Sequence, residues 1–559
     1  MPNEKLLRFG RAGHFWQDCG LLGLWSMLKD ICQGDVKLSL DSEGLSLEGE
    51  PSLMESALMA AYDRLVARYY DVSTQKQRDN KEGYNFYLDT KTETFVPFPK
   101  KKTYGIAQMV YDNPPSASVT QVGWKKGKAG DLPDSLAQLQ PSLDRFLDQQ
   151  GLKPTGKNLL LDGPNEIRPK AELFMSEEGK KGKNVCALCG GRTSKAVDVK
   201  STVFPLLGGN SAGLSFNPEG GKPDKACWKC AFTGLFTPAV GLFRSSGGML
   251  FAYFPFSSSM EALKEFLPSM KAMKDEDPNG YYNFDIRLGD YFSRESEMTL
   301  AFLHHLYVTL KNHRGEDDPL EIDELLDLVS SQGDLGFYVL AADPHTQPKG
   351  IKSLWPFTDT RWIFRLFDCL EKEGKDLKKV MALLVDWDAK KDKTLIRDRI
   401  CRAMLNGRSI LEATERLVYH LFGGKDRAYI APLVDFVVFY EKNGRRTVGM
   451  KDEYREAAVR LGKRIGSIAG SNDREKGEKR GRSCLYSLRR SRSMVTFMEQ
   501  LNRLQFRMAG GLVIPPDIYG GALSEANFQE FKQYCMICAL NSYFAAQSSK
   551  QGNNTQEVL

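Results

Sequence analysis

The sequence Cys186-Ala-Leu-Cys189 is matched further along the chain by Cys227-Trp-Lys-Cys230. Two cysteines separated by two residues can present both thiolates to one ion from a single tight turn. Gly190 and Gly191 follow the first pair, where such a turn needs residues that tolerate positive φ. The two pairs therefore predict a closed tetrahedral shell of four thiolates, in which Zn²⁺ holds shape and does no chemistry. Two unrelated buried pairs, or a redox dithiol, are the alternatives.

The regions around the cysteine pairs differ in character. Alternating apolar and polar residues over 36–48 predict a β-hairpin, and apolar spacing near 3.6 predicts helices over 20–32 and 52–70. From about residue 260 helical periodicity dominates, with long helices predicted over 395–422 and 483–508. We therefore predict an α+β multidomain fold. Its N-terminal half is mixed α/β with an inserted four-cysteine zinc ribbon, and its second half is mostly helical and ends in a small helical bundle.

The predicted domain boundaries follow these changes. A chain of 559 residues exceeds one ordinary hydrophobic core, so two to four domains are expected. We place an N-terminal α+β region at 1–182, the zinc-ribbon insertion at 183–235, a strand-then-helical body at 236–430 and the helical bundle at 431–559.

The composition is that of an ordinary globular protein, 42% hydrophobic and 26% charged. We expect no signal peptide, because the apolar run over 21–28 is short and sits between Asp18 and Lys29. No run approaches the ~20 apolar residues that span a bilayer. Eleven cysteines, an odd number, fit a reducing compartment better than a disulfide framework. We expect a cytoplasmic protein with no membrane partner.

Sequence patterns typical of catalysis are missing. Residues 151–157 are similar to a phosphate-binding loop, but Asn158 replaces its hydroxyl ligand and the flanking helix and strand come in reversed order. The zinc-deaminase pattern and the nucleophile elbow are absent. Cys535 and Cys538 lie in an apolar helical run and are predicted to pack in a core. We expect no enzymatic activity, with a metal-dependent nuclease or hydrolase as an alternative.

Basic residues are concentrated near the C-terminus. Residues 450–510 hold 15 lysines and arginines against 7 acidic residues, although the net charge of the chain is only +6. An uneven basic segment of this kind usually faces a polyanion, and a solvated charged face is the alternative. The nucleic-acid-binding residues predicted here are Lys463, Arg464, Arg480, Arg482, Arg489, Arg490 and Arg492.

The N-terminal string Gly10-x-x-Gly13-His14-Phe15-x-x-Asp18-Cys19-Gly20-x-x-x-Leu24, with the two cysteine pairs, resembles the CRISPR-associated CXXC–CXXC family. Members of that family are large subunits of type I-A and I-B CRISPR effector complexes, known as Cascade. The resemblance covers most of the chain in the order of its features.

The resemblance implies a non-catalytic prokaryotic subunit that sits at the 5′ end of the crRNA. Such a subunit recognises the PAM, a short motif on double-stranded target DNA, supports R-loop formation and recruits a helicase–nuclease or transposition proteins. Its partners would be the crRNA, the target duplex, the displaced single strand and the Cascade backbone and crRNA 5′-end subunits. Guide pairing would read the rest of the target sequence. The C-terminal bundle would resemble the Cascade small subunit, made separately from an internal start near Met450.

Three segments are candidates for reading the PAM, because basic loops flanked by glycine can enter a groove. They contribute Lys125, Lys126 and Lys128, then Lys180, Lys181 and Lys183, and lastly Asn210 between the cysteine pairs. A stand-alone zinc-ribbon protein that binds nucleic acid without a guide complex is the alternative function.

Overall fold

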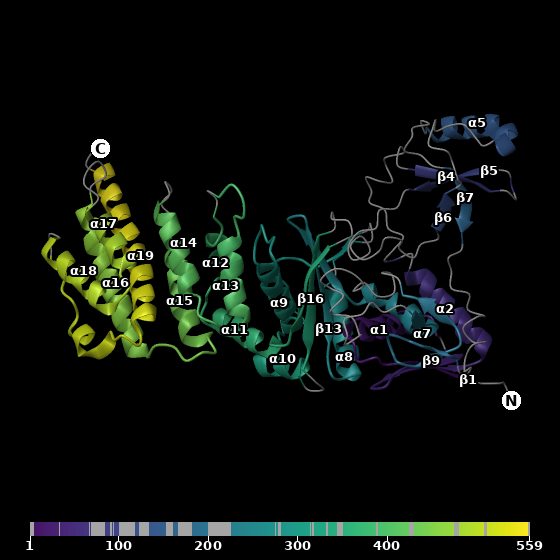
Figure 1. Ribbon diagram of the computed structural model, residues 1–559, viewed down its shortest axis with the longest axis horizontal. Coiled ribbons are helices and arrows are strands. Elements are labelled where there is room, and N and C mark those ends of the chain that lie inside the picture. Colours follow the sequence, from purple (N-terminus) through teal and green to yellow (C-terminus); the bar gives the residue numbers. More distant parts are fainter. Residues whose placement is uncertain are drawn as a thin grey trace. The chain divides into compact units, whose positions relative to one another are not determined.

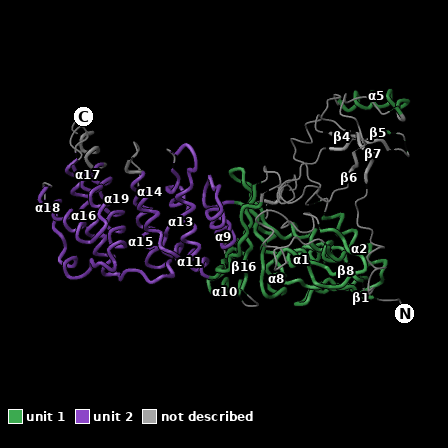
Figure 2. Tube along the Cα trace, viewed as in Figure 1, with its two compact units in different colours: residues 1–285, 308–361 green, residues 286–307, 362–559 purple. Residues whose placement is uncertain are grey.

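The structure, a computed structural model, describes most of the chain in segments. They are residues 5–32, 34–65, 68, 84–89, 92, 94–99, 118–121, 134–151, 160–165, 182–199, 225–273, 275–277, 281–313, 315, 318–330, 334–343, 350–386, 389–423, 430–473, 480–507 and 511–556. The chain divides into two compact units, which Figure 2 colours separately. Unit 1 comprises residues 1–285 and 308–361, and unit 2 comprises residues 286–307 and 362–559.

Unit 1 combines several small sheets with helices (Figure 1). Its strands are β1 (Lys5–Gly10), β2 (Val36–Asp41), β3 (Gly44–Gly49), β4 (Tyr84–Asp89), β5 (Thr94–Pro99), β6 (Ser118–Gln121), β7 (Leu160–Asn165), β8 (Asn184–Val185), β9 (Arg192–Thr193), β10 (Ala196–Asp198), β11 (Lys225–Cys227), β12 (Leu242–Ser246), β13 (Met249–Phe256), β14 (Asp275–Asp277), β15 (Tyr281–Asn283), β16 (Gly336–Asp343) and β17 (Gly350–Phe357). Its helices are α1 (Phe15–Lys29), α2 (Pro51–Leu65), η3 (Asp134–Leu139), α5 (Gln140–Gln150), α7 (Trp228–Gly234), η5 (Thr237–Ala239), α8 (Met260–Ala272) and α10 (Ile322–Leu328).

The first sheet of unit 1 contains the hairpin that the sequence predicts. β2 pairs with β3 in antiparallel register from Val36 opposite Gly49 to Asp41 opposite Gly44, and β1 pairs along the other edge of β3. Asp41 Oδ1 accepts hydrogen bonds from the backbone N–H groups of Glu43 and Gly44, which closes the turn. The hairpin prediction is confirmed.

A six-stranded sheet forms the centre of unit 1, in the order β14-β15-β12-β13-β16-β17. Neighbouring strands are antiparallel, except that β12 and β15 run parallel. β13 is buried over most of its length, which explains its continuous apolar sequence, and α1 packs against it. Phe15 of α1 stacks on Tyr338 of β16, with ring centroids 4.2 Å apart. The N-terminal string thus starts a helix that covers the central sheet.

Unit 2 is helical. Its helices are most of α9 (Glu295–Lys311), α11 (Thr360–Lys372), α12 (Leu377–Leu383), α13 (Leu395–Leu405), α14 (Leu411–Gly423), α15 (Ala431–Asn443), α16 (Asp452–Asn472), α17 (Arg480–Arg490), α18 (Met494–Arg507), the π-helical turn η6 (Ile518–Ala522) and α19 (Phe528–Gln556). The predicted fold class is therefore confirmed: the described strands lie mostly in the N-terminal half and end with β17, and the described elements after β17 are helices. The predicted four-part division of the chain stays a prediction.

Two long helices predicted from periodicity are each broken in the structure. The one predicted over 395–422 is α13 and α14, separated at Gly407, whose φ of 61° a helix does not adopt. The one predicted over 483–508 is α17 and α18, separated by residues 491–493, and α17 already begins at Arg480. Apolar spacing continues through both breaks because the helices on either side bury similar faces.

The predicted core position of Cys535 and Cys538 is confirmed. Both side chains are buried on α19, where that helix packs tightly against α16. Gly466 of α16 permits the close approach, because a Cβ there would lie 1.9 Å from the carbonyl oxygen of Ala539. Burial raises the pKa of Cys538 to about 12, so this thiol stays protonated and behaves as an apolar group.

No helix among the described residues combines the length and the apolar character that crossing a bilayer requires.

Candidate metal centre

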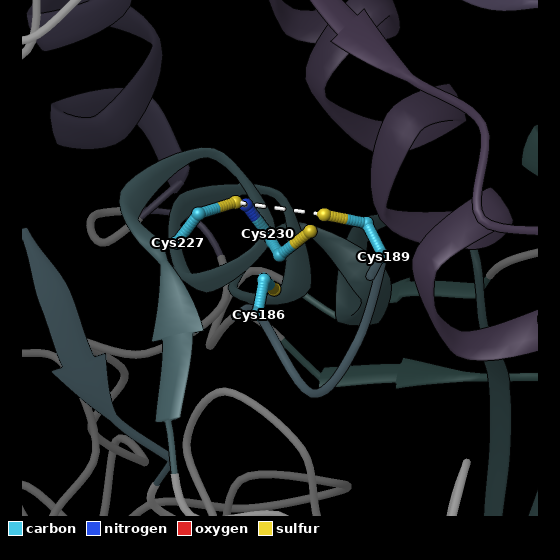
Figure 3. Close-up of side chains that lie close together, drawn as sticks. All are labelled: Cys186, Cys189, Cys227 and Cys230. Atoms are coloured by element: carbon cyan, nitrogen blue, oxygen red, sulfur yellow. Dashed lines mark hydrogen bonds between the residues drawn. The ribbon is translucent and has the colours of Figure 1, made fainter. Parts of the chain in front are cut away.

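The four cysteines of the two Cys-x-x-Cys pairs converge in unit 1. Their sulfur atoms all lie within 4.8 Å of one another, and the Sγ atoms of Cys189 and Cys227 are 3.9 Å apart (Figure 3). A tetrahedral shell with metal–sulfur bonds of about 2.3 Å would separate its sulfurs by about 3.8 Å. The spacing of the cysteine sulfurs therefore fits one metal ion at the centre of the four.

The first pair lies on a tight turn between β8 and β9. Cys186 donates its backbone N–H to the carbonyl of Gly191, and the N–H of Gly190 donates back to the carbonyl of Cys186. Gly190 has a φ of 71°, as the sequence led us to expect at this position. The N–H of Leu188 points at Cys186 Sγ at 3.4 Å, a contact that stabilises a thiolate.

The second pair lies at the junction between β11 and α7. Cys227 ends the strand, caps the helix and accepts the N–H of Cys230 on its sulfur at 3.5 Å. β11 pairs with β10, and the carbonyl of Lys225 accepts the N–H of Ala187 from the first turn. Backbone hydrogen bonds thus join the two turns directly.

Hydrogen bonds among the four thiols shift their pKa values in opposite directions. Bonds from Cys189, Cys227 and Cys230 lower the pKa of Cys186, whereas sharing with Cys186 raises the pKa of Cys227 and Cys230. For Cys189 the bond with Cys186 raises the pKa, but bonds from the second pair outweigh it, and the pKa falls to about 7. Four adjacent thiolates would repel one another strongly, so full ionisation requires a cation among them.

This arrangement is suited to a structural role. Cys186 and Cys230 are buried, Cys227 is half-buried and Cys189 is exposed. Four protein ligands around one ion leave no position for water or substrate, so the site can crosslink two turns but has no open coordination position.

The helix that follows the second cysteine pair packs directly against the helix of the N-terminal string. A Cβ on Gly20 of α1 would lie 2.4 Å from the carbonyl oxygen of Thr233, and one on Gly23 would lie 2.3 Å from that of Phe236. Thr237 Oγ1 also donates to the carbonyl of Trp16 at 2.7 Å. The sequence analysis placed 183–235 in a separate insertion and did not predict this contact. Gly20 and Gly23, which lie on one face of the predicted helix over 20–32, could have indicated that another segment packs closely there.

The N-terminal string also lines a cavity of about 760 Å³. Arg11 Nε donates to Asp18 Oδ2 at 2.9 Å, and its terminal nitrogens donate to the carbonyls of Ser257 and Ser258. Burial raises the pKa of Asp18 against the opposing effect of Arg11, and burial lowers the pKa of His14 to about 4. Through Arg11, the N-terminal string therefore links α1 to the residues that directly follow β13.

The predicted nucleic-acid residues of the C-terminal region lie on helices. Lys463 and Arg464 are exposed on α16, and Arg480, Arg490 and Arg492 are exposed on or next to α17. Arg482 is half-buried, and its backbone N–H donates to Asp473 Oδ2. Arg480 and Arg482 therefore belong to α17, which begins before the helix start predicted at residue 483.

Arg489 differs from its neighbours on α17. Its guanidinium lies 4.0 Å from the ring centroid of Tyr419 and its Nε is 3.4 Å from Glu415 Oε1, so it packs against α14. Lys183 is exposed directly before β8. The candidates Lys125, Lys126, Lys128, Lys180, Lys181 and Asn210 lie outside the described residues.

Comparison with known proteins adds no identification. No protein-family model matches the chain, and no curated protein matches it significantly.

Proposed function

We propose that this chain is the non-catalytic large subunit of a type I CRISPR RNA-guided complex, which recognises the PAM, supports R-loop formation and recruits the effector proteins. The observation that carries the proposal is the contact between Gly20 and Thr233. The N-terminal string and the second cysteine pair are the two specific elements of the resemblance, and they are more than 200 residues apart. Their direct packing means that both elements belong to one structural unit.

We propose zinc as the ion of the cysteine centre. Four thiolates are the ligand set of structural zinc sites, and the observed sulfur spacing suits its bond length. Bound there, zinc would tie the β8–β9 turn to the start of α7 and so fix α7 against α1. In a protein whose role is to hold nucleic acid and partners, the ion would serve as scaffold.

The distribution of metal-type side chains supports a non-catalytic role. Within the described part of the chain, the cysteine quartet is the one group of three or more histidine, cysteine or acidic side chains that could hold a metal ion. A metal-dependent nuclease needs carboxylate or histidine ligands around an accessible ion. The alternative of a metal-dependent nuclease or hydrolase therefore finds no cluster of carboxylate or histidine ligands among the described residues.

Exposed arginines support contact between the C-terminal helices and a nucleic-acid backbone. Arg490 and Arg492 are exposed at the C-terminal end of α17, and Lys463 and Arg464 add charge on α16. Phosphate contacts of this type are independent of sequence, which fits a subunit that leaves target reading to guide pairing.

Co-purification tests the proposed function. The tagged chain, expressed with its neighbouring genes, should carry a crRNA of uniform length together with several copies of a backbone protein. The matched control is a tagged chain with Cys227→Ser and Cys230→Ser, which should recover less of the complex because α7 loses its anchor. A chain that purifies without crRNA and without a backbone protein would favour the stand-alone zinc-ribbon alternative.

An internal start at Met450 is a separate part of the proposal. Met450 lies two residues before α16, and its backbone N–H donates to Glu530 Oε1 on α19, so a product over 450–559 would contain whole helices. A C-terminal tag should reveal that product beside the full chain, and Met450→Leu should remove it. An immunoblot with only the full-length band would contradict it.

A further inference from the structure

Five basic residues of unit 1 lie on or shortly after α1, α2 and α8, and none of them was among the residues expected to bind nucleic acid. Three of them, Lys29, Arg64 and Lys271, occupy the last turns of α1, α2 and α8, and Lys264 and Arg68 complete the group. α1 packs against both α2 and α8, and the charges of Lys29 and Arg64 act on Lys271. We call this group the Trp25 cluster.

Two ammonium groups of the cluster share one aromatic ring. Lys29 Nζ and Lys264 Nζ each lie 5.4 Å from the centroid of Trp25, although they come from different helices. A cation over an indole face gains about 0.5–1 kcal/mol at an exposed site, but two like charges at one ring also repel each other. An anion placed between the two ammonium groups would remove that repulsion.

Three basic side chains and one carboxylate act most strongly on the charge of Lys271. Burial lowers the pKa of Lys271, Asp30 raises it, and Arg68, Arg64 and Lys29 lower it further. Asp30 is already bound by Arg64, at 2.9 Å. A basic residue in the last turn of a helix interacts favourably with the helix dipole, which accounts for each of Lys29, Arg64 and Lys271 separately. It does not explain why three such ends meet, nor why Lys264 joins them from the middle of α8.

The spacing of the cluster suits a polyanion. Lys264 and Lys271 are two helical turns apart on the same face of α8, a separation of about 10 Å along the axis. Lys29 of α1 and Arg64 of α2 add positive charge that acts on Lys271. Such a row can contact successive phosphates of one strand, and no single small anion would reach both ends.

We propose that the Trp25 cluster is a second nucleic-acid contact, which binds the sugar–phosphate backbone of duplex DNA. This site goes beyond the proposed function, since none of its residues was among those expected to bind nucleic acid, and it belongs to unit 1, whereas the C-terminal arginines belong to unit 2. A lipid surface fits less well, because membrane-binding faces carry exposed apolar side chains beside their basic ones, whereas Trp25 is half-covered and faces ammonium groups.

The experiment compares two charge-reversed variants of the full-length protein. Lys264→Glu with Lys271→Glu alters the cluster, and Lys5→Glu with Lys37→Glu makes the same change in net charge at exposed positions elsewhere in unit 1. Binding of a labelled 30-base-pair duplex is followed by fluorescence anisotropy over a series of salt concentrations. We expect the cluster variant to bind about tenfold more weakly or worse, and its salt dependence to fall by about two phosphate contacts. The control should stay within about twofold of the wild type.

A local readout protects the test against misfolding of a variant. The emission of Trp25, obtained as the difference between the wild type and Trp25→Phe, should change when duplex is added to the unaltered protein. Equal losses in both charge-reversed variants, or an unchanged Trp25 signal, would overturn the proposal. Preferential binding to vesicles containing anionic phospholipid over duplex would overturn it as well. Absence of crRNA in the co-purification would sink the proposed function and leave this site standing.

Discussion

Gly20 and Thr233 lie in contact although 213 positions of sequence numbering separate them, and a Cβ on Gly20 would be 2.4 Å from the carbonyl oxygen of Thr233. The neighbouring atom is backbone, so it cannot move aside as a flexible side chain could. This contact sets the distance between α1 and α7 and connects the cysteine centre to the core of unit 1.

Replacing Gly20 by Leu should therefore destabilise unit 1 by about 3 kcal/mol or more, because the added side chain forces the two helices apart. Metal content should fall with stability, since α7 carries Cys230. Gly10→Ala is the matched control, because nothing lies within 4 Å of a Cβ at that position. Thermal unfolding and elemental analysis of both variants measure the effect, and a Gly20→Leu protein as stable as the control would contradict it.

The purified chain should contain one zinc ion per molecule. Cys227→Ser with Cys230→Ser should abolish binding, because the remaining pair supplies only two thiolates. Cys369→Ser is the control, since Cys369 is exposed and lies in the other unit. Mass spectrometry of metals, with unfolding curves before and after a chelator, provides the measurement. A metal-free protein with an unchanged unfolding curve would refute the assignment.

Acid should destabilise unit 1 in part through His14. Burial lowers its pKa to about 4 in the folded chain, against about 6.5 unfolded, so the unfolded state binds more protons between these values. The His14 contribution is present above about pH 6.5 and is lost as pH falls towards 4, by about 3 kcal/mol. The raised pKa of Asp18 acts in the opposite direction.

The comparison of wild type with His14→Asn isolates the effect of this histidine. Asn can also cap α1, where His14 Nδ1 now accepts the N–H of Trp16. Chemical unfolding at intervals from pH 7 to 4 should show a smaller loss of stability in the variant. Parallel losses in both proteins would assign the acid sensitivity to other groups.

Neighbouring arginines of α17 should behave differently when they are changed. Arg490→Glu with Arg492→Glu should weaken binding of single-stranded DNA about tenfold with little effect on stability, because both side chains are exposed. Arg489→Gln should mainly lower stability, since this side chain lies between Tyr419 and Glu415. Anisotropy and unfolding measurements on both variants separate the two roles, and identical profiles would contradict the distinction.

The core of unit 2 holds a buried ion pair that can be tested directly. Arg397 Nε donates to Glu297 Oε2 at 2.6 Å, and both side chains are buried. Glu297→Ala leaves the guanidinium buried without its partner and should cost about 3–5 kcal/mol. The exposed Glu373→Ala should change the free energy of unfolding by less than about 0.5 kcal/mol. A small effect of Glu297→Ala would mean that water or another group replaces the carboxylate.

Local sequence patterns predicted the metal centre, the first hairpin and most of the helices. The spacing of the cysteines and the glycines after Cys189 predicted the metal centre, because both turns are closed by residues a few positions apart. The hairpin over 36–49 was predictable for the same reason. Periodicity predicted the helices but missed the breaks at Gly407 and at 491–493, since the buried face continues across them.

Contacts between distant segments were decided by the tertiary structure alone. The sequence by itself determined that four thiols could share an ion and that positive charge gathers after residue 450. Only the tertiary structure shows that α7 packs against Gly20 and that Arg489 packs on Tyr419. It also shows that Lys29 and Lys264 lie near the same indole ring. The reason is physical: spacing along the chain specifies a turn or a helix face, but which faces meet depends on close packing among many elements at once.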